Sequence, residues 1–352
     1  MTAEHTCKCS PARPGVNPRN LVVCIDGTSN RFGAKNTNIV ELYSHIVKSD
    51  EQLTYYSSGL GAIPKVAEPP LGRRFSNEID MAVGRNLQKV IMTAYRWLSD
   101  YYRDGDKIYL FGFSRGAYQV RALAGMIARV GLILPGNNEQ IPFAFDVYSK
   151  INDDNSGTLE QGPLGSFRTK RFTKQNNHVE LAETFKRTFS RKDVRVHFLG
   201  AWDTVSSVGF GRGDMLPSTI SSCDHICFFR HALALDERRV KFLPEYVYGG
   251  RAHPFHDNHV KEVWFAGSHS DYLQSGDIPL LWMRSQAMAA GLQLEAADVR
   301  WKISDLEKPI TPSLKPGWWF LELLPIKRLL YYNSNRITNK CVGKAPPTRS
   351  KI

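Results

Sequence analysis

The 352-residue sequence contains no apolar run long enough to cross a lipid bilayer, which excludes a transmembrane helix. Its first residues carry no hydrophobic stretch of the kind found in a signal peptide. We therefore expect an intracellular, cytoplasmic protein, unless export follows a non-classical route. The sequence also lacks internal repeats, and its composition is otherwise that of an ordinary globular protein.

Cysteine is scarce, with six residues in the whole chain. Cys223 and Cys227 flank His225, but a zinc site there would need a second ligand pair that the neighbouring sequence does not supply. Cys7 and Cys9 lie in a polar, proline-containing segment. The pattern favours free thiols in a reducing compartment, and we expect neither a metal nor any other cofactor.

Acidic residues are fewer than basic ones: the chain has 34 Asp and Glu and 46 Lys and Arg, which gives a formal net charge of +12. A basic surface favours anionic partners, so an anionic membrane surface is one expected partner. No RNA- or DNA-binding motif accompanies the charge, and no nucleic-acid partner is expected. A basic surface without any such partner is the equally simple alternative. The oligomeric state stays open.

We expect a single α/β domain with insertions. Residues 1–19 are polar and rich in proline, which predicts a disordered leader. The folded domain is expected over residues 20–335, with insertions near 136–191 and 212–259. The first insertion is placed where a lid often lies, and the second is interpreted as loop and helix. Residues 336–352 are expected to form a frayed C-terminal tail.

Strand and helix patterns alternate along most of the chain. Residues 20–25 form a continuous apolar run, which is typical of a central parallel strand. This alternation predicts an α/β fold with a mostly parallel central sheet and helices on both faces. Further strands are expected at 53–56, 107–111, 194–203 and 260–265, and helices near 39–46, 78–102, 117–130, 179–189 and 279–290.

The sequence Gly112-Phe113-Ser114-Arg115-Gly116 lies between an expected strand and an expected helix. In this context a G-x-S-x-G motif forms a tight turn that projects the serine hydroxyl from the sheet. The flanking glycines let strand and helix approach without Cβ clashes, and the helix N-terminus favours a nearby oxyanion. Ser114 is therefore the expected nucleophile, with a chance serine in an ordinary turn as the alternative.

Two further candidates follow later strands. Asp203 ends the strand expected at 194–203, and His269 follows the strand expected at 260–265. The chain order Ser, Asp, His is that of α/β hydrolases. Because the carboxyl ends of parallel strands share one edge of a sheet, we expect the three side chains to converge. His269 would then act as the base, and Asp203 would orient its imidazole.

The turn Asp26-Gly27-Thr28 follows the first expected strand. We expect this turn and the backbone N–H of Arg115 to bind the oxyanion, so Asp26, Gly27, Thr28 and Arg115 are the substrate-binding candidates. An aspartate here would also suit a haloacid-dehalogenase-like phosphatase. That loop requires an aspartate nucleophile at the position of Cys24, and the phosphatase alternative is therefore disfavoured.

Other acids and histidines compete for the same roles. Asp271 could be a supporting acid, or it could simply cap a helix or lie in a loop. His197 lies inside a strand and is expected to be a core histidine. His231 lies in a helical-looking run that ends at Glu237, and a structural or supporting role is expected, with a catalytic role as the alternative.

A further signal comes from five segments taken together: 23–28, 112–118, 198–205, 231–239 and 264–271. As a set they resemble the DUF2235 family, whose bacterial members include phospholipase effectors of type VI secretion. The resemblance implies an α/β-hydrolase-like fold, with phospholipase activity in the effector members. It also implies Ser114 as nucleophile, Asp203 as acid and His269 as base. After the His-Ser-Asp element the family commonly has a glycine-rich turn. This chain instead has Tyr272-Leu273-Gln274-Ser275-Gly276 there.

We therefore expect a serine esterase or lipase that cleaves an acyl ester, with a lipid or phospholipid as the preferred substrate. The basic charge and the cluster Trp318-Trp319-Phe320 favour a lipid surface. The departure in the loop after His269 supports one alternative, a catalytically silent binding protein with the same fold. A hydrolase of small soluble esters is the other alternative.

Overall fold

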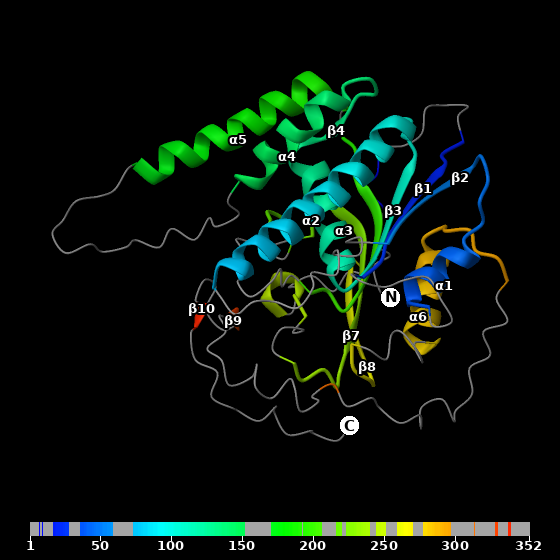
Figure 1. The fold of residues 1–352 in the computed structure, drawn as a ribbon. Helices are drawn as coiled ribbons and strands as arrows, with labels where there is room; N and C mark the ends of the chain where they lie inside the picture. The colour runs from blue at the N-terminus through cyan, green and yellow to red at the C-terminus, as the bar shows by residue number, and fades with distance from the viewer. Residues whose placement is uncertain are drawn as a thin grey trace.

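The chain is described from a computed structural model (Figure 1). The structure describes residues 7, 9, 17–27, 36–58, 73–151, 170–191, 193–205, 216–219, 223–239, 244–250, 259–269, 277–296, 313, 328–329 and 337–338. Its strands are β1 (Asn20–Ile25), β2 (Gln52–Ser57), β3 (Lys107–Phe113), β4 (Leu132–Ile133), β5 (Ser190–Arg191), β6 (Val196–Trp202), β7 (Ile226–Ala234), β8 (Val260–Phe265), β9 (Arg328–Leu329) and β10 (Ile337–Thr338). Its α-helices are α1 (Asn38–His45), α2 (Arg73–Tyr101), α3 (Arg115–Val130), α4 (Ile141–Ser149), α5 (Lys170–Phe189) and α6 (Asp277–Ala289).

Six strands form one sheet in the order β2-β1-β3-β6-β7-β8. Every neighbouring pair in this sheet is parallel. Parallel neighbours need a crossover connection, and the helices of this chain supply such connections. The expected α/β fold with a parallel sheet is confirmed, and all six carboxyl ends lie at one edge.

Helices cover both faces of the sheet (Figure 1). The core on one face contains residues of α2, α3, α4 and α5, and the core on the other face contains residues of α1 and α6. In β1, Leu21, Val23 and Ile25 join the first core, whereas Val22 and Cys24 join the second. Burial on both faces is the reason that β1 is continuously apolar.

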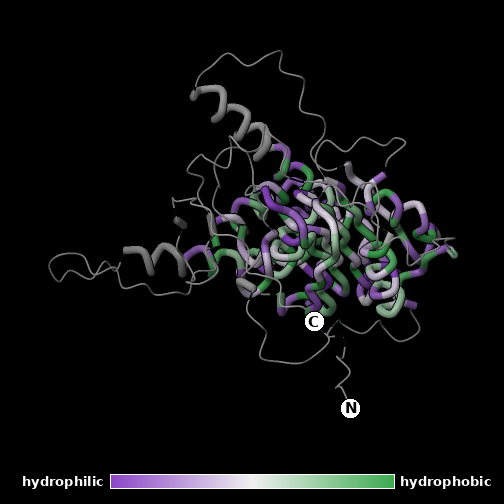
Figure 2. Tube along the Cα trace, turned by 90° about the horizontal axis from the view of Figure 1, so that it is seen from below, coloured by the Kyte–Doolittle hydropathy of each residue, from purple (hydrophilic) through white to green (hydrophobic). Residues whose placement is uncertain are grey.

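Helices α1, α2 and α6 each pack one face against the sheet, whereas α4 and α5 pack against α3. Hydrophobic and hydrophilic residues alternate along their traces in Figure 2. Helix α1 begins at an N-cap residue of a favoured type, because the side-chain oxygen of Thr37 accepts a hydrogen bond of 3.2 Å from the backbone N–H of Val40. No helix in the described part of the chain combines the length and the apolar character needed to cross a membrane.

The prediction of loop and helix for the insertion at 212–259 is wrong where β7 forms. This strand lies between β6 and β8, and all but one of its residues are buried. A strand that is buried on both faces has apolar side chains at consecutive positions, which the spacing of a short run does not distinguish from a helix. His231 therefore lies on a central strand.

The other expected boundaries are described only in part. Helices α4 and α5 lie in the expected insertion at 136–191, where both contact α3. Cys7 and Cys9 are described within the expected leader, and β10, within the expected tail, pairs with β9 in antiparallel fashion. The remaining leader and tail residues lie largely outside the described residues.

Candidate active site

Ser114 lies between β3 and α3 in an unusual backbone conformation, with φ at 57° and ψ at −122°. A positive φ is costly for a residue with a Cβ atom, so the surrounding structure must hold this turn in place. The Ser114 N–H donates to the Trp202 carbonyl over 2.9 Å, and the Ser114 carbonyl accepts from the Val205 N–H over 3.2 Å. The end of β6 thus fixes the turn.

The glycines on either side of Ser114 allow the expected close approach. A Cβ atom on Gly116 would lie 2.2 Å from the carbonyl oxygen of Ile25, at the end of β1. A Cβ atom on Gly112 would lie 2.5 Å from the carbonyl oxygen of Gly116. Both distances are too short for real contacts, so both positions require glycine.

The structure brings Ser114, Asp203 and His269 together at the carboxyl edge of the sheet. The Oγ atom of Ser114 lies 2.9 Å from Nε2 of His269. On the other side of the ring, Nδ1 of His269 is hydrogen-bonded to Oδ2 of Asp203. Since a carboxylate accepts only, Nδ1 carries the proton of the neutral ring and Nε2 presents a lone pair to the serine hydroxyl.

These three side chains lie in a sheltered environment. Asp203 is fully buried, and Ser114 and His269 are 8% and 6% exposed. The ring of Phe113 stacks on the imidazole of His269 with a centroid distance of 4.8 Å. The second carboxylate oxygen of Asp203 accepts from the backbone N–H of Ala234 over 3.2 Å. Each member of the group is thus held by neighbours as well as by the other members.

The loop that carries His269 is held by an acidic pair that the sequence analysis assigned no role. Oε2 of Glu237 accepts from the backbone N–H of His269 over 3.3 Å, and Oδ2 of Asp236 accepts from the N–H of Gly267 over 2.9 Å. Asp236 and Glu237 closely follow β7, at the same edge of the sheet as the candidate residues. This position is the sequence signal that could have indicated a supporting role for them.

Arg239 fixes the carboxylate of Glu237 through both of its oxygens, at 2.9 Å from Nε and 2.7 Å from a terminal nitrogen. Burial alone would raise the pKa of Glu237, but the hydrogen bonds and charge of Arg239, with a smaller contribution from His269, hold this pKa below its usual range. Glu237 is therefore ionised where it holds the His269 backbone.

His231 supports the other side of the site. Its Nε2 accepts from the backbone N–H of Thr204 over 3.1 Å, next to Asp203, and its Nδ1 lies 2.9 Å from Oε1 of Glu262. Burial lowers the pKa of His231, although the hydrogen bond to Glu262 opposes this shift. A supporting role for this histidine matches the expectation from sequence.

The turn after β1 is held by the side chain of Asp26. Oδ1 of Asp26 accepts from the Gly27 N–H over 2.6 Å, and Oδ2 accepts from the hydroxyls of Thr37 and Tyr56 over 2.9 and 3.2 Å. Asp26 thereby ties β1 to α1 and β2. In this arrangement the Gly27 N–H donates to the Asp26 carboxylate, and its expected part in binding an oxyanion stays a prediction.

The remaining candidates are described only in part. Thr28, Asp271, the loop 272–276 and the cluster 318–320 lie outside the described residues. Arg115 begins α3 directly after Ser114 and is half-buried, and burial lowers the pKa of its guanidinium. The backbone N–H of Arg115 remains a candidate donor to an oxyanion.

A parallel sheet, a serine on a strained turn before a helix, and Asp and His after later strands define an α/β-hydrolase-like fold. Residues 19–286 match the family described as the type VI secretion phospholipase effector Tle1-like catalytic domain. The chain belongs to this family, which corresponds to the DUF2235 family that its motifs resemble. Membership supports a hydrolase of the lipase or esterase type.

Comparison with individual proteins gives one relative that matches over part of its length and several solved structures of low sequence identity. The uncharacterized protein YEL023C of Saccharomyces cerevisiae is 38% identical over 248 residues, which are 66% of this chain and 33% of that protein. The chain thus spans about a third of the length of this curated relative. An uncharacterized protein from Pseudomonas aeruginosa is 15% identical at a TM-score of 0.43, covering 82% of this chain and 48% of that structure. The peroxisomal alpha-beta-hydrolase Lpx1 of Saccharomyces cerevisiae is 10% identical at a TM-score of 0.24, covering 82% and 81%.

Proposed function

We propose that this chain is a serine hydrolase that cleaves an acyl ester through Ser114, His269 and Asp203. The observation that supports this proposal is the continuous hydrogen-bonded series from the Ser114 hydroxyl through the His269 ring to the buried Asp203 carboxylate. A chance serine in a turn would not require this series, nor the strained backbone that presents the hydroxyl.

In the proposed reaction, Oγ of Ser114 attacks the carbonyl carbon of the ester while its proton passes to Nε2 of His269. Asp203 keeps the imidazole oriented and stabilises its positive charge. The tetrahedral oxyanion is stabilised by the backbone N–H of Arg115 at the start of α3. Collapse of this intermediate releases the alcohol, which takes the proton from Nε2, and leaves an acyl group on Ser114. Water then repeats the sequence and releases the acid.

We further propose a lipid ester, with a phospholipid as the preferred case, as the substrate. The family to which the chain belongs carries the description of a phospholipase effector catalytic domain. A formal charge of +12 supports the same choice, because a basic surface favours anionic head groups.

The test is hydrolysis of p-nitrophenyl esters from acetate to palmitate by the wild type, by Ser114→Ala and by a matched control. Ser44→Ala serves as the control, because Ser44 lies on the exposed surface of α1, far along the chain from the site. We expect Ser114→Ala to lower kcat/KM by at least about 10³-fold, as for other removed serine nucleophiles, and Ser44→Ala to leave it unchanged.

A fluorophosphonate probe provides an independent readout of the same serine. Labelling of the wild type and of Ser44→Ala, with none of Ser114→Ala, is the expected result. Equal, near-background hydrolysis and labelling in all three proteins would overturn the proposal and favour the binding protein. Hydrolysis that peaks at acetate and is absent on phosphatidylcholine–phosphatidylglycerol vesicles would overturn the lipid substrate alone.

A further inference from the structure

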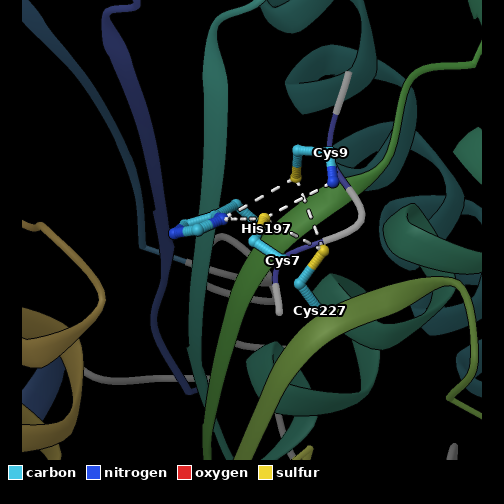
Figure 3. A group of neighbouring side chains, drawn as sticks. All are labelled: Cys7, Cys9, His197 and Cys227. Carbon is cyan, nitrogen blue, oxygen red and sulfur yellow. Dashed lines mark hydrogen bonds between the residues drawn. The ribbon is translucent and has the colours of Figure 1, made fainter. Parts of the chain in front are cut away.

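Three cysteines and one histidine from distant parts of the sequence meet beside the amino ends of two central strands. Cys7 and Cys9 precede β1, His197 lies near the start of β6, and Cys227 lies near the start of β7. Figure 3 shows the three sulfur atoms and the imidazole turned toward a common centre. The three Sγ atoms and one ring nitrogen all lie within 4.8 Å of one another.

The distances between the four candidate ligand atoms fit tetrahedral coordination of one metal ion. Cys227 Sγ lies 3.5 Å from the Sγ atoms of both Cys7 and Cys9. Nδ1 of His197 lies 3.1 Å from Sγ of Cys7 and 3.7 Å from Sγ of Cys9. Zinc–sulfur bonds of about 2.3 Å and zinc–nitrogen bonds of about 2.0 Å give tetrahedral edges of about 3.5 to 3.8 Å. Small shifts therefore bring all four atoms onto one ion.

His197 is oriented as a metal ligand. Its Nε2 lies 2.9 Å from the carbonyl oxygen of Ala290, which accepts only, so Nε2 carries the ring proton. The lone pair of Nδ1 then faces the sulfur atoms. The same carbonyl accepts from the Tyr109 hydroxyl over 2.7 Å, and the rings of Tyr109 and Phe228 contact the imidazole edge to face. A hydrogen bond from the second nitrogen is a regular feature of histidine ligands.

The arrangement suits an ion better than a disulfide. A disulfide would join two sulfur atoms and leave the third beside the imidazole with only weak thiol hydrogen bonds. The backbone N–H of Cys9 also points at Cys7 Sγ over 3.4 Å, a contact that stabilises a thiolate ligand. His197 and Cys227 are buried, whereas Cys7 is exposed, so an ion can enter from solvent on the side of Cys7.

We propose that Cys7, Cys9, His197 and Cys227 bind one zinc ion in a tetrahedral structural site. Three thiolates and one imidazole form a ligand set that favours zinc and fills all four positions. Because the four protein ligands occupy all coordination positions of the ion, no water can bind to it, and its role is structural rather than catalytic. It attaches Cys7 and Cys9 to β6, which Asp203 directly follows, and to β7, which carries His231.

The proposed ion is remote from the candidate active site. His197 and Asp203 lie near opposite ends of β6, and a strand rises about 3.3 Å per residue, which separates them by about 20 Å. Of the residues Cys223, His225 and Cys227 that were weighed as zinc ligands from the sequence, only Cys227 belongs to this cluster. Cys223 instead contacts Nε2 of His259 over 3.8 Å and the Tyr248 hydroxyl over 3.6 Å.

The test measures zinc in the full-length protein, purified without chelators and with a non-chelating reductant. Mass spectrometry of metals should find about one zinc ion per wild-type chain. The double variant Cys7→Ser/Cys9→Ser should lose this zinc yet keep its far-ultraviolet circular dichroism, because both residues precede the folded strands. Cys223→Ser is the matched control, a buried thiol outside the cluster, and should keep the zinc.

Cobalt replacement tests the ligand set itself. The wild type loaded with Co²⁺ should give the visible bands of a tetrahedral ion and the near-ultraviolet bands of thiolate ligands, and both should be lost in the double variant. Zinc in the wild type no higher than in the double variant would overturn the proposal. So would a wild-type mass, without reductant, lighter by two hydrogens through a disulfide within the cluster.

Discussion

The backbone N–H of Thr204 donates a hydrogen bond of 3.1 Å to Nε2 of His231, a fully buried histidine on the central strand β7. Because Nε2 accepts, the ring is neutral and its proton lies on Nδ1, which faces Glu262. Protonation of Nε2 would remove the acceptor that holds the backbone next to Asp203. The charge of His231 is therefore coupled to the geometry of the candidate site.

This coupling predicts a loss of stability in acid. The pKa of His231 is lowered by burial and by Arg121, against the opposing effects of Glu262 and Asp203. Below a pH of about 6.5 the unfolded chain binds a proton at this histidine that the folded chain does not. The free energy of unfolding should then fall by up to about 1.4 kcal/mol per pH unit from this group.

Urea unfolding of the wild type and of His231→Gln between pH 7.5 and 5.5 measures this effect. Glutamine keeps an acceptor for the Thr204 N–H but does not titrate. The variant should be less stable at pH 7.5 and should lose less stability on acidification than the wild type. Parallel pH dependences of the two proteins would contradict the prediction.

Asp203→Asn should remove most activity without unfolding the protein. An amide can donate to Nδ1 of His269, which would hold the ring in the tautomer that cannot accept the Ser114 proton. We expect kcat on a p-nitrophenyl ester to fall by about 10³- to 10⁴-fold, as for the equivalent change in serine proteases. Asp146→Asn, on the exposed surface of α4 beside Lys150, is the control and should leave kcat unchanged.

Gly116→Ala should damage both stability and the serine turn. Its Cβ atom would lie 2.2 Å and 2.5 Å from the carbonyl oxygens of Ile25 and Asp26, both backbone atoms. Overpacking of this kind costs about 1 to 3 kcal/mol, and relief requires β1 and α3 to separate. We expect a lower midpoint in urea and slower labelling of Ser114 by a fluorophosphonate.

Gly136→Ala provides the comparison for this change. Its Cβ atom would meet nothing within 4 Å, although a φ of 87° makes alanine strained there. Stability should fall by about 1 kcal/mol, and Ser114 should react at the wild-type rate. Equal labelling rates in both alanine variants would show that the close approach of α3 to β1 does not position the serine.

Removal of the proposed zinc ion should lower Tm while sparing catalysis at moderate temperature. A chelator would release the segment around Cys7 and Cys9, but the ion lies about 20 Å from the candidate active site. Thermal unfolding and ester hydrolysis, each with and without dipicolinate and then with added zinc, separate the two effects. A loss of hydrolysis well below Tm that zinc restores would contradict a purely structural ion.

Much of the fold and of the candidate site could be predicted from local patterns. The apolar run of β1, the cap at Thr37 and the strand–turn–helix around Ser114 each depend on neighbours in the sequence. Asp203 and His269 could be placed because each follows a strand, and parallel strands share their carboxyl edge. Such features are set by short-range sterics and periodicity, which a sequence displays directly.

Tertiary structure alone decided the rest. The local sequence of β7 predicts loop and helix, and the segment is a strand because it pairs with β6 and β8 on its two sides. The links from the Asp26 carboxylate to Thr37 and Tyr56 depend on how α1 and β2 pack beside β1. Cys7 and His197 are separated by 190 positions, and no local pattern relates them. Sequence by itself determines which groups are present and on which strand ends they fall, whereas only packing between distant segments determines which of them become partners.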